Sequence, residues 1–258
     1  MKRIGIALTA VAVMLVAAST AFAAVNNYNA TYKFSGKKGT ASKPAALSFD
    51  QLIKVTPGTA GNRTGILHTI KTTIQGVKVD TKGFPTCTAS KINAASNDNK
   101  CSKKALVATG AIKATLGSAT DFTQAGAACD PLLHVWNGGK GKLIFFFVDQ
   151  GSHQCLGGQL HTGQVGPWTA KYKQAGKNLD VTIPIPNTVD YPLGTSGGEV
   201  GSLSYERLAW KSQSMNGKSD IVSTGCKSSK RSYSFTFNAS LPGQSAETKT
   251  TKGKAACG

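Results

Sequence analysis

The sequence predicts an all-β fold, an antiparallel β-sandwich stapled by disulfides. Short segments in which apolar and polar residues alternate recur along the chain; Tyr233, Phe235 and Phe237, for example, alternate with polar neighbours. Glycine-containing turn sequences such as "TPGTAGN" and "KQAGKN" separate nearly every pair of these segments. The chain also holds six cysteines, an even number. Many short strands joined by turns favour two packed antiparallel sheets.

Strand patterns occur through most of the chain. In order, the expected strands cover residues 31–34, 46–55, 66–74, 105–115, 131–136, 143–148, 168–173, 181–186, 203–210, 220–224 and 231–241. Pro184 indicates an edge strand or a strand end, because proline cannot donate to a β-ladder. Residues 89–95 carry a weak helical pattern. The polar segment 245–258 is expected to be held only through Cys257.

The first 23 residues have the pattern of a secretory signal peptide. A basic pair precedes the apolar residues 4–16, and an A-x-A cleavage site ends at Ala23. We therefore expect residues 24–258 to form one secreted domain, with a subdivision near residue 125 as the alternative. This predicts an extracellular protein, and association with the cell wall is a further expectation. The most apolar later segment, residues 143–148, is too short for a membrane span.

The composition is strongly basic. Two of the 30 basic residues lie in the signal, so residues 24–258 carry 28 basic and 12 acidic residues, a net charge of +16. Such a charge attracts anionic partners, for which wall polymers and polysaccharides are our candidates. However, 26 of the 30 basic residues in the full sequence are lysines, and they are scattered along the chain. Bidentate phosphate recognition favours arginine instead. A solubilising surface is therefore favoured over a specific nucleic-acid groove.

The cysteines are expected to form disulfides, although six cysteines allow fifteen connectivities. The pair 87 and 101 brackets a polar loop that lacks the apolar content to pack itself. The pairs 129 and 155, and 226 and 257, each flank a hairpin pattern. We therefore favour sequential pairing over a zinc site, because no Cys-x-x-Cys motif is present. The residues concerned are Cys87, Cys101, Cys129, Cys155, Cys226 and Cys257.

Several segments together resemble a group of uncharacterised secreted actinobacterial all-β proteins with cysteine-stapled hairpins. The resemblance rests on "GVKVDTKGFPTC" ending at Cys87, "ALVATGAIKATLG", "LDVTIPIPN", and a closing hairpin from "GCKSSKRSYSFTFNASL" to Cys257. Ser102 follows Cys101 where the group usually carries proline, and the middle cysteine pair is not a feature of the group. The resemblance implies export and fold, and it implies no activity.

The most specific enzymatic pattern is "GTSGGEV", which contains Ser196 in a G-x-S-x-G context. An α/β-hydrolase requires its histidine after the serine, but all four histidines precede Ser196. The order His68, Asp121, Ser196 would suit a chymotrypsin-like triad. However, Thr195 replaces the aspartate before the nucleophile, and His68 lies in an ordinary strand pattern. A serine hydrolase using Ser196 is therefore only an alternative.

Other chemistries are less well supported. Glu199 and Glu206 are seven residues apart, which places them on opposite faces of one regular strand and not as a glycosidase pair. His134, His153 and His161 have no diagnostic metal spacing, so we expect structural histidines and no metal or cofactor. The sequence "NGKS" at residues 216–219 fits a hairpin turn better than a phosphate-binding loop.

An aromatic platform for sugars is the last alternative, and the side chains concerned are Trp136, Trp168, Trp210, Tyr172 and Tyr191. Aromatic residues in sandwiches are more often core. We therefore favour a non-catalytic secreted protein in which a lysine-rich face contacts anionic wall polymers. A carbohydrate-binding module and a serine hydrolase remain the alternatives, and the oligomeric state is not indicated.

Overall fold

A computed structural model describes residues 24–194, 198–226 and 229–258, so residues 1–23 and Ser196 lie outside it. The predicted all-β antiparallel class is confirmed. The strands are β1 Asn26–Gly36, β2 Ala45–Pro57, β3 Ile66–Gln75, β4 Val77–Val79, β5 Leu106–Ser118, β6 Ala127–Cys129, β7 Leu132–Gly139, β8 Lys142–Val148, β9 Trp168–Ala175, β10 Asn178–Pro184, β11 Glu199–Trp210, β12 Ser214–Met215, β13 Lys218–Ser219, β14 Ile221–Ser223, β15 Lys230–Ser240 and β16 Glu247–Ala256. The α-helices are α1 Ala89–Ala95 and α2 Asn187–Asp190, and short 3-10 turns cover Lys103–Ala105, Leu156–Gly158 and Thr162–Gln164.

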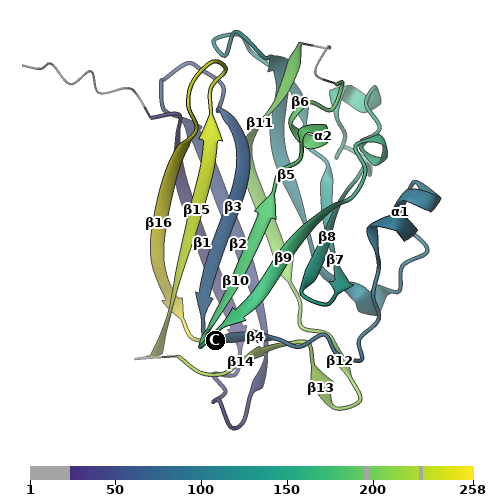
Figure 1. The fold of residues 1–258 in the computed structure, drawn as a ribbon, viewed down its shortest axis with the longest axis vertical. Helices are drawn as coiled ribbons and strands as arrows, with labels where there is room; N and C mark the ends of the chain where they lie inside the picture. Colours follow the sequence, from purple (N-terminus) through teal and green to yellow (C-terminus); the bar gives the residue numbers. More distant parts are fainter. Residues whose placement is uncertain (1–23, 195–197, 227–228) are drawn as a thin grey trace, which may run out of the picture.

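The two packed layers belong to one continuous sheet. Its strand order is β16-β15-β3-β10-β9-β8-β7-β5-β11-β2-β14-β4, with β1 added to β2 and β6 to β5. In Figure 1 the strands β16, β15, β3, β10 and β9 form the near layer, and β1, β2 and β11 lie behind them. Strands that precede residue 125 in the sequence lie next to strands that follow it, so the two halves of the chain share one sheet.

The layers pack around an interior rich in aromatic side chains. Tyr28 and Tyr32 of β1 stack on Phe237 and Phe235 of β15, with ring centroids 4.0 and 4.8 Å apart. Inward residues recur at every second position of both strands, as the pleat requires. The alternation seen in the sequence thus fills one shared core, in which Phe235 and Phe237 are fully buried.

Strands β7 and β8 are buried on both faces. Phe145 and Phe147 point into the shared interior, whereas Ile144 and Phe146 point outward. The outward pair is covered by the segment that carries α1, in which Ile92 is fully buried. This explains why β8 has a continuous apolar run and not an alternating one.

Three disulfides are present, in the sequential order: Cys87–Cys101, Cys129–Cys155 and Cys226–Cys257. The first closes the loop that carries α1, and the backbone N–H of Cys87 joins this loop to β7 by donating to the carbonyl of Asn137 at 2.9 Å. No cysteine in the described part of the chain is free. Over the same residues, no helix has the length and apolar character needed to cross a membrane.

The expectation that residues 245–258 form a polar tail was wrong. Glu247–Ala256 is strand β16, which pairs with β15 from Glu247 to Ala256. Its outward positions are threonine and lysine, which suit an exposed strand at the edge of a sheet. Because the inward positions are small or polar, the strand lacks the apolar alternation that reveals the others.

Two local expectations can be compared with the backbone. Pro184 is the last residue of β10, a strand that lies between β3 and β9, so it marks a strand end and not an edge. The "NGKS" segment is the turn of the β12–β13 hairpin, with φ of 51° at Asn216 and 72° at Gly217. Positive φ at both turn residues is the geometry of a tight two-residue hairpin turn. The segment is therefore a hairpin turn and not a phosphate-binding loop.

Arg231 is fully buried where β15 meets β3, β14 and the chain end. Its guanidinium donates to the carbonyl of Gln75, to Ser223 Oγ at 2.8 Å and to the carbonyl of Cys257 at 3.2 Å. The guanidinium carbon also lies 4.9 Å from the centre of the Phe34 ring. Burial lowers the pKa of Arg231 to about 10. One side chain therefore joins three segments that are distant in sequence.

We expect Arg231→Met to lower the free energy of unfolding by about 3 kcal/mol, because several buried acceptors lose their donor. Urea unfolding followed by tryptophan fluorescence measures this. Arg207→Met is the matched control: Arg207 is exposed and pairs with Asp50 at 3.6 Å, so its loss should cost under about 1 kcal/mol. Equal costs for the two variants would show that Arg231 does not anchor this end.

Candidate functional site

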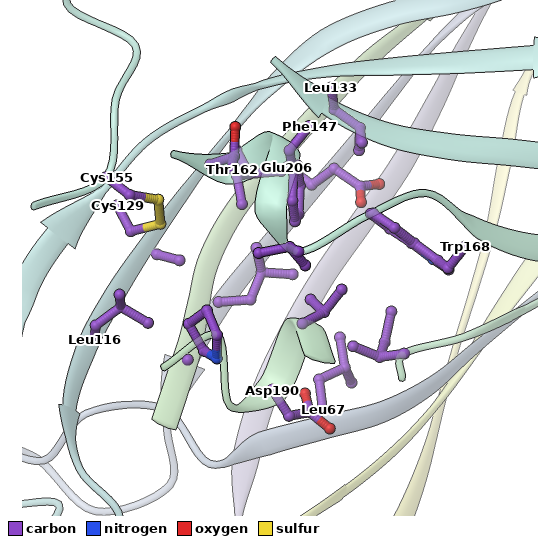
Figure 2. A pocket seen from close by; sticks show the side chains of 18 of the residues that line it. Leu67, Leu116, Cys129, Leu133, Phe147, Cys155, Thr162, Trp168, Asp190 and Glu206 are labelled. Atoms are coloured by element: carbon purple, nitrogen blue, oxygen red, sulfur yellow. A yellow bond between two sulfur atoms is a disulfide. The ribbon is translucent and has the colours of Figure 1, made fainter. Parts of the chain in front are cut away.

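The interior contains a cavity of about 80 Å³ between the two layers, close to α2 (Figure 2). Both layers contribute to its wall, as do the Cys129–Cys155 disulfide and the segment after it. Most lining side chains are aliphatic or aromatic. The lining residues include Leu67, Ile70, Ile112, Ala114, Leu116, Leu133, Phe147, Leu160, Thr162, Trp168, Ile185, Asp190, Leu203 and Glu206.

Glu206 enters this wall because β11 contains a β-bulge. The register between β11 and β5 shifts between Leu203 and Tyr205. Gly201 and Leu203 line the cavity before the bulge, and Glu206 lines it afterwards, so the inward side changes from odd to even positions. The assumption of one regular strand, which would place Glu199 and Glu206 on opposite faces, therefore fails here.

The Glu206 carboxyl is held by a chain of buried hydrogen bonds. Gln51 Nε2 donates to Oε1 of Glu206 at 2.5 Å. Gln51 Oε1 in turn accepts from the Tyr32 hydroxyl at 3.1 Å, and that hydroxyl lies 3.0 Å from Thr72 Oγ1. The Thr72 hydroxyl donates to the carbonyl of Ser234. Burial raises the pKa of Glu206 to about 7, although the Gln51 hydrogen bond opposes this.

Asp190, the last residue of α2, lines the opposite side of the cavity (Figure 2). Its carboxyl is buried, and this burial raises its pKa to about 7. The neighbouring base is His68, whose Nδ1 lies 3.7 Å from Asp190 Oδ2. The cavity thus has one buried carboxyl group on each side, both in largely apolar surroundings.

The partners of His68 are Ser240 and Asp190, and not Asp121, the acid proposed for it from sequence. Its Nε2 lies 2.8 Å from Ser240 Oγ, and its Nδ1 faces Asp190. Asp121 instead accepts from the hydroxyl of Thr123 at 2.6 Å, and Ser196 lies outside the described residues. The order serine, histidine, aspartate is suggestive, but 3.7 Å is too long for the hydrogen bond that orients a catalytic histidine.

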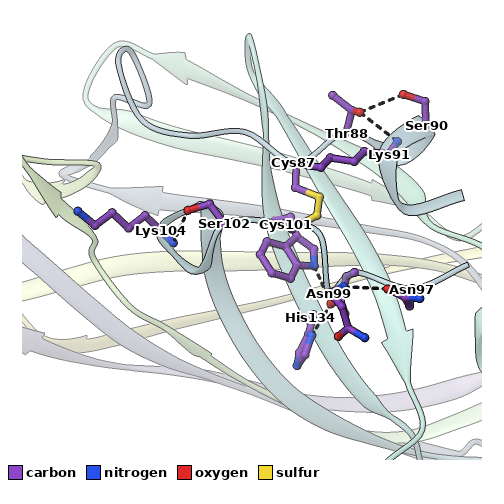
Figure 3. Close-up of a disulfide and its surroundings, with 12 residues drawn as sticks. Cys87, Thr88, Ser90, Lys91, Asn97, Asn99, Cys101, Ser102, Lys104 and His134 are labelled. Atoms are coloured by element: carbon purple, nitrogen blue, oxygen red, sulfur yellow. Dashed lines mark hydrogen bonds and ion pairs between the residues drawn. A yellow bond between two sulfur atoms is a disulfide. The ribbon is translucent and has the colours of Figure 1, made fainter. Parts of the chain in front are cut away.

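Two of the three histidines considered as metal ligands, His134 and His153, have separate partners, and His161 is exposed. His134 Nδ1 lies 2.6 Å from Asp98 Oδ2, which also accepts from the indole N–H of Trp136 at 3.1 Å (Figure 3). His153 Nδ1 lies 3.2 Å from the carbonyl oxygen of Asp130. In the described ranges, no group of three or more His, Cys, Asp or Glu side chains is arranged to hold a metal ion. The His134 contact fixes the loop closed by Cys87–Cys101.

The tryptophans do not form an exposed platform for sugars. Trp136 is 4% exposed, Trp210 7% and Trp168 8%. Trp168 and Trp210 belong to the interior, and Trp136 lies beneath the α1 segment. Tyr172, which is half-buried, places its hydroxyl 3.0 Å from Thr81 Oγ1. The three tryptophans therefore fill cores, as was favoured from the sequence, and the alternative of a sugar platform finds no exposed tryptophan ring among them.

The outer face of the near layer is polar and basic. Strand register places Thr250, Thr236, Lys71, Thr182, Lys171 and Lys142 in one row, and Lys252, Ser234, Thr73, Asp180 and Lys173 in the next. We call this surface the lysine face, defined by the exposed residues Lys71, Lys142, Lys171, Lys173, Lys252 and Lys254. Asp180 is the one acidic residue in these two rows, and it accepts from Thr73 at 2.8 Å.

A depression on the lysine face gathers several hydrogen-bonding groups. Lysine ammonium, hydroxyl and amide groups line it among the described residues, and the Asp180 carboxylate lies next to it, bonded to Thr73. The polar residues that line it are Thr73, Gln75, Asn178, Ser232, Ser234, Lys252 and Lys254. Sequence reasoning could not find this surface, because its lysines come from strands far apart in the chain.

Comparison with known proteins adds no assignment. No family model and no curated protein matches the chain. One solved structure, of AvmM, which catalyses macrocyclization in alchivemycin A biosynthesis, aligns over 89% of both chains at 7% sequence identity with a TM-score of 0.26. A similarity at this level carries no statement about fold or function.

The buried carboxyls predict an unusual pH dependence of stability. Glu206 keeps its proton up to about pH 7 when folded, whereas its ordinary pKa is 4.5. The folded state therefore binds more protons between these values, so the free energy of unfolding falls as pH rises from about 5 to about 8. Asp190, with an ordinary pKa of 3.8, contributes with the same sign.

Glu206→Gln, which is neutral throughout, should be more stable than the wild type at about pH 8, by on the order of 1 kcal/mol or more. Urea unfolding at several pH values provides the measurement. Glu206→Gln combined with Asp190→Asn should flatten the profile further, and Glu199→Gln on the same strand should leave it unchanged. A wild-type stability that rises between pH 5 and pH 8 would contradict the assignment.

Proposed function

We propose that this is a secreted, non-catalytic protein that binds anionic cell-wall or surface polymers through its lysine face. The observation that carries the proposal is the cross-strand register that gathers six exposed lysines on one outer surface. Between them lie threonine and serine hydroxyls, which can donate hydrogen bonds to phosphate, sulfate or carboxylate oxygens. A net charge of +16 for residues 24–258 would strengthen the attraction at long range.

The spacing of the charges favours an extended ligand. Lys252 and Lys173 lie at the two ends of one row, four strands apart, which corresponds to about 19 Å at the usual strand spacing. A single small anion could not contact both ends, whereas a polymer with repeated anionic groups could. Lysine provides hydrated point charges on flexible stems, so such binding would depend on charge density more than on a particular sugar or base.

Export is part of the same proposal. Residues 1–23 have the sequence pattern of a secretory signal, and three disulfides require an oxidising environment. The described helices contain no candidate membrane span. Together these features support a protein that works outside the cytoplasm, where anionic wall polymers are abundant partners.

Replacing Lys71, Lys171 and Lys252 by serine should weaken binding to purified cell wall about tenfold, since three exposed contacts of about 0.5 kcal/mol each sum to about 1.5 kcal/mol. Co-sedimentation at rising NaCl concentration measures the affinity, which should fall as screening increases. The matched control replaces three exposed lysines of the other layer, Lys33, Lys54 and Lys113.

The control has the same net charge as the first triple variant, so it separates the lysine face from overall basicity. Equal weakening by both variants would reduce the interaction to non-specific attraction. Binding that is indifferent to salt would reject the electrostatic basis altogether.

A further inference from the structure

We propose that the internal cavity binds a small, uncharged and mostly apolar molecule that carries a carbonyl oxygen. This site is distinct from the lysine face, because it lies between the layers and shares no residue with that surface. The inference goes beyond polymer binding and does not depend on it.

The apolar wall selects an apolar body for the ligand. Side chains from both layers, including Leu67, Ile112, Leu133 and Phe147, surround the space. A cavity lined in this way loses little by excluding water and gains dispersion contacts from a ligand that fills it. Pockets of this type, with a few polar groups among apolar ones, are the usual form of small-molecule sites.

Unpaired polar atoms in the wall indicate where the ligand is recognised. The indole Nε1 of Trp168 and Oγ1 of Thr162 are buried, and among the described residues neither has a hydrogen-bond partner. Both residues line the cavity. A buried polar group without a partner costs about 1–3 kcal/mol, so the unpaired Trp168 N–H favours a bound acceptor. Thr162 lies beside the Asp149 carboxylate, whose Oδ2 accepts from the Thr162 backbone N–H at 2.8 Å, so its hydroxyl is the weaker indicator.

The carboxyl groups set the charge of the ligand. Gln51 donates to Oε1 of Glu206, and the Glu206 side chain lines the cavity. Burial raises the pKa of both Glu206 and Asp190 to about 7, so each keeps its proton, and its donor O–H, to unusually high pH. A wall that offers indole, hydroxyl and carboxyl donors complements an acceptor oxygen and not an anion or a cation.

The volume limits the size of the ligand. A water-sized group needs roughly 10–15 Å³ by the same measure, so 80 Å³ accommodates about five to eight non-hydrogen atoms. Short ketones and five-membered cyclic ketones have this size. We therefore use cyclopentanone, 2-butanone and 2-pentanone as probes, with cyclopentane as the hydrocarbon control and cyclopentylammonium as the charged control.

The experiment uses the disulfide-bonded protein from residue 24 and measures binding by saturation-transfer NMR and by the shift in unfolding temperature. We expect at least one ketone to bind, with cyclopentane binding about tenfold more weakly and cyclopentylammonium not binding. Failure of all three ketones, or preference for the ammonium ion, would overturn the proposal.

Variants locate the site. Ala114→Leu fills part of the cavity and should abolish ketone binding, whereas Ala111→Leu lies on the other face of β5 and should preserve it. Trp168→Phe keeps an aromatic ring but removes the N–H, so it should weaken ketone binding about tenfold and leave cyclopentane binding unchanged. Ketone binding that survives both Ala114→Leu and Trp168→Phe would place the site elsewhere.

If Ala114→Leu does not fold, Trp168→Phe alone decides, because it adds no volume. The triple lysine variant described above should bind the ketone as the wild type does. Loss of ketone binding in that variant would contradict the independence of the two sites, while loss of wall binding alone would leave the cavity proposal intact.

Discussion

The packing of β1 against β15 holds the two layers of the sheet together. β1 has a ladder partner only in β2, and β16 only in β15, so hydrogen bonds between strands do not join these two outer strands to each other. Instead the rings of Tyr28 and Tyr32 stack on β15, and Lys249 Nζ donates to the carbonyl of Asn26 at 3.0 Å. Aromatic contacts add to burial in such an arrangement. The apolar residues of these strands point into the interior, so the outer face of the near layer consists mainly of threonine, serine and lysine.

The same interior contains polar groups that a simple sandwich core would exclude. The chain from Glu206 through Gln51 and Tyr32 to Thr72 runs across both layers, which fixes their relative position more sharply than apolar packing can. It exists because the bulge near Ser204 changes the side on which β11 presents its residues. An irregularity of one residue thus places a carboxyl group in the wall of an apolar cavity.

The parts that could be predicted were those with strong local patterns. Alternation identified the strands around Phe235 and Val181, glycine identified the turn at Gly217, and the long apolar run of β8 indicated a fully buried strand. β16 was missed because threonine and lysine at its outward positions, and small residues inward, carry no apolar period. The cavity could not be predicted, since Glu206 faces it only through a bulge and its wall combines residues from distant strands. The lysines looked scattered in sequence because cross-strand register, and not sequence proximity, brings them together.

The α1 segment covers apolar side chains that lie on the outside of the sheet. It covers Ile144 and Phe146 on the outside of β8. The Cys87–Cys101 bond closes the loop that carries it, and the contact between Asp98 and His134 of β7 holds it to the sheet. In a reducing compartment the Cys87–Cys101 disulfide would be lost. Loosening of the segment would then expose apolar side chains beside Trp136. Exposed apolar side chains of this kind promote self-association. The thiol chemistry of its surroundings would therefore control the colloidal behaviour of the protein as well as its stability.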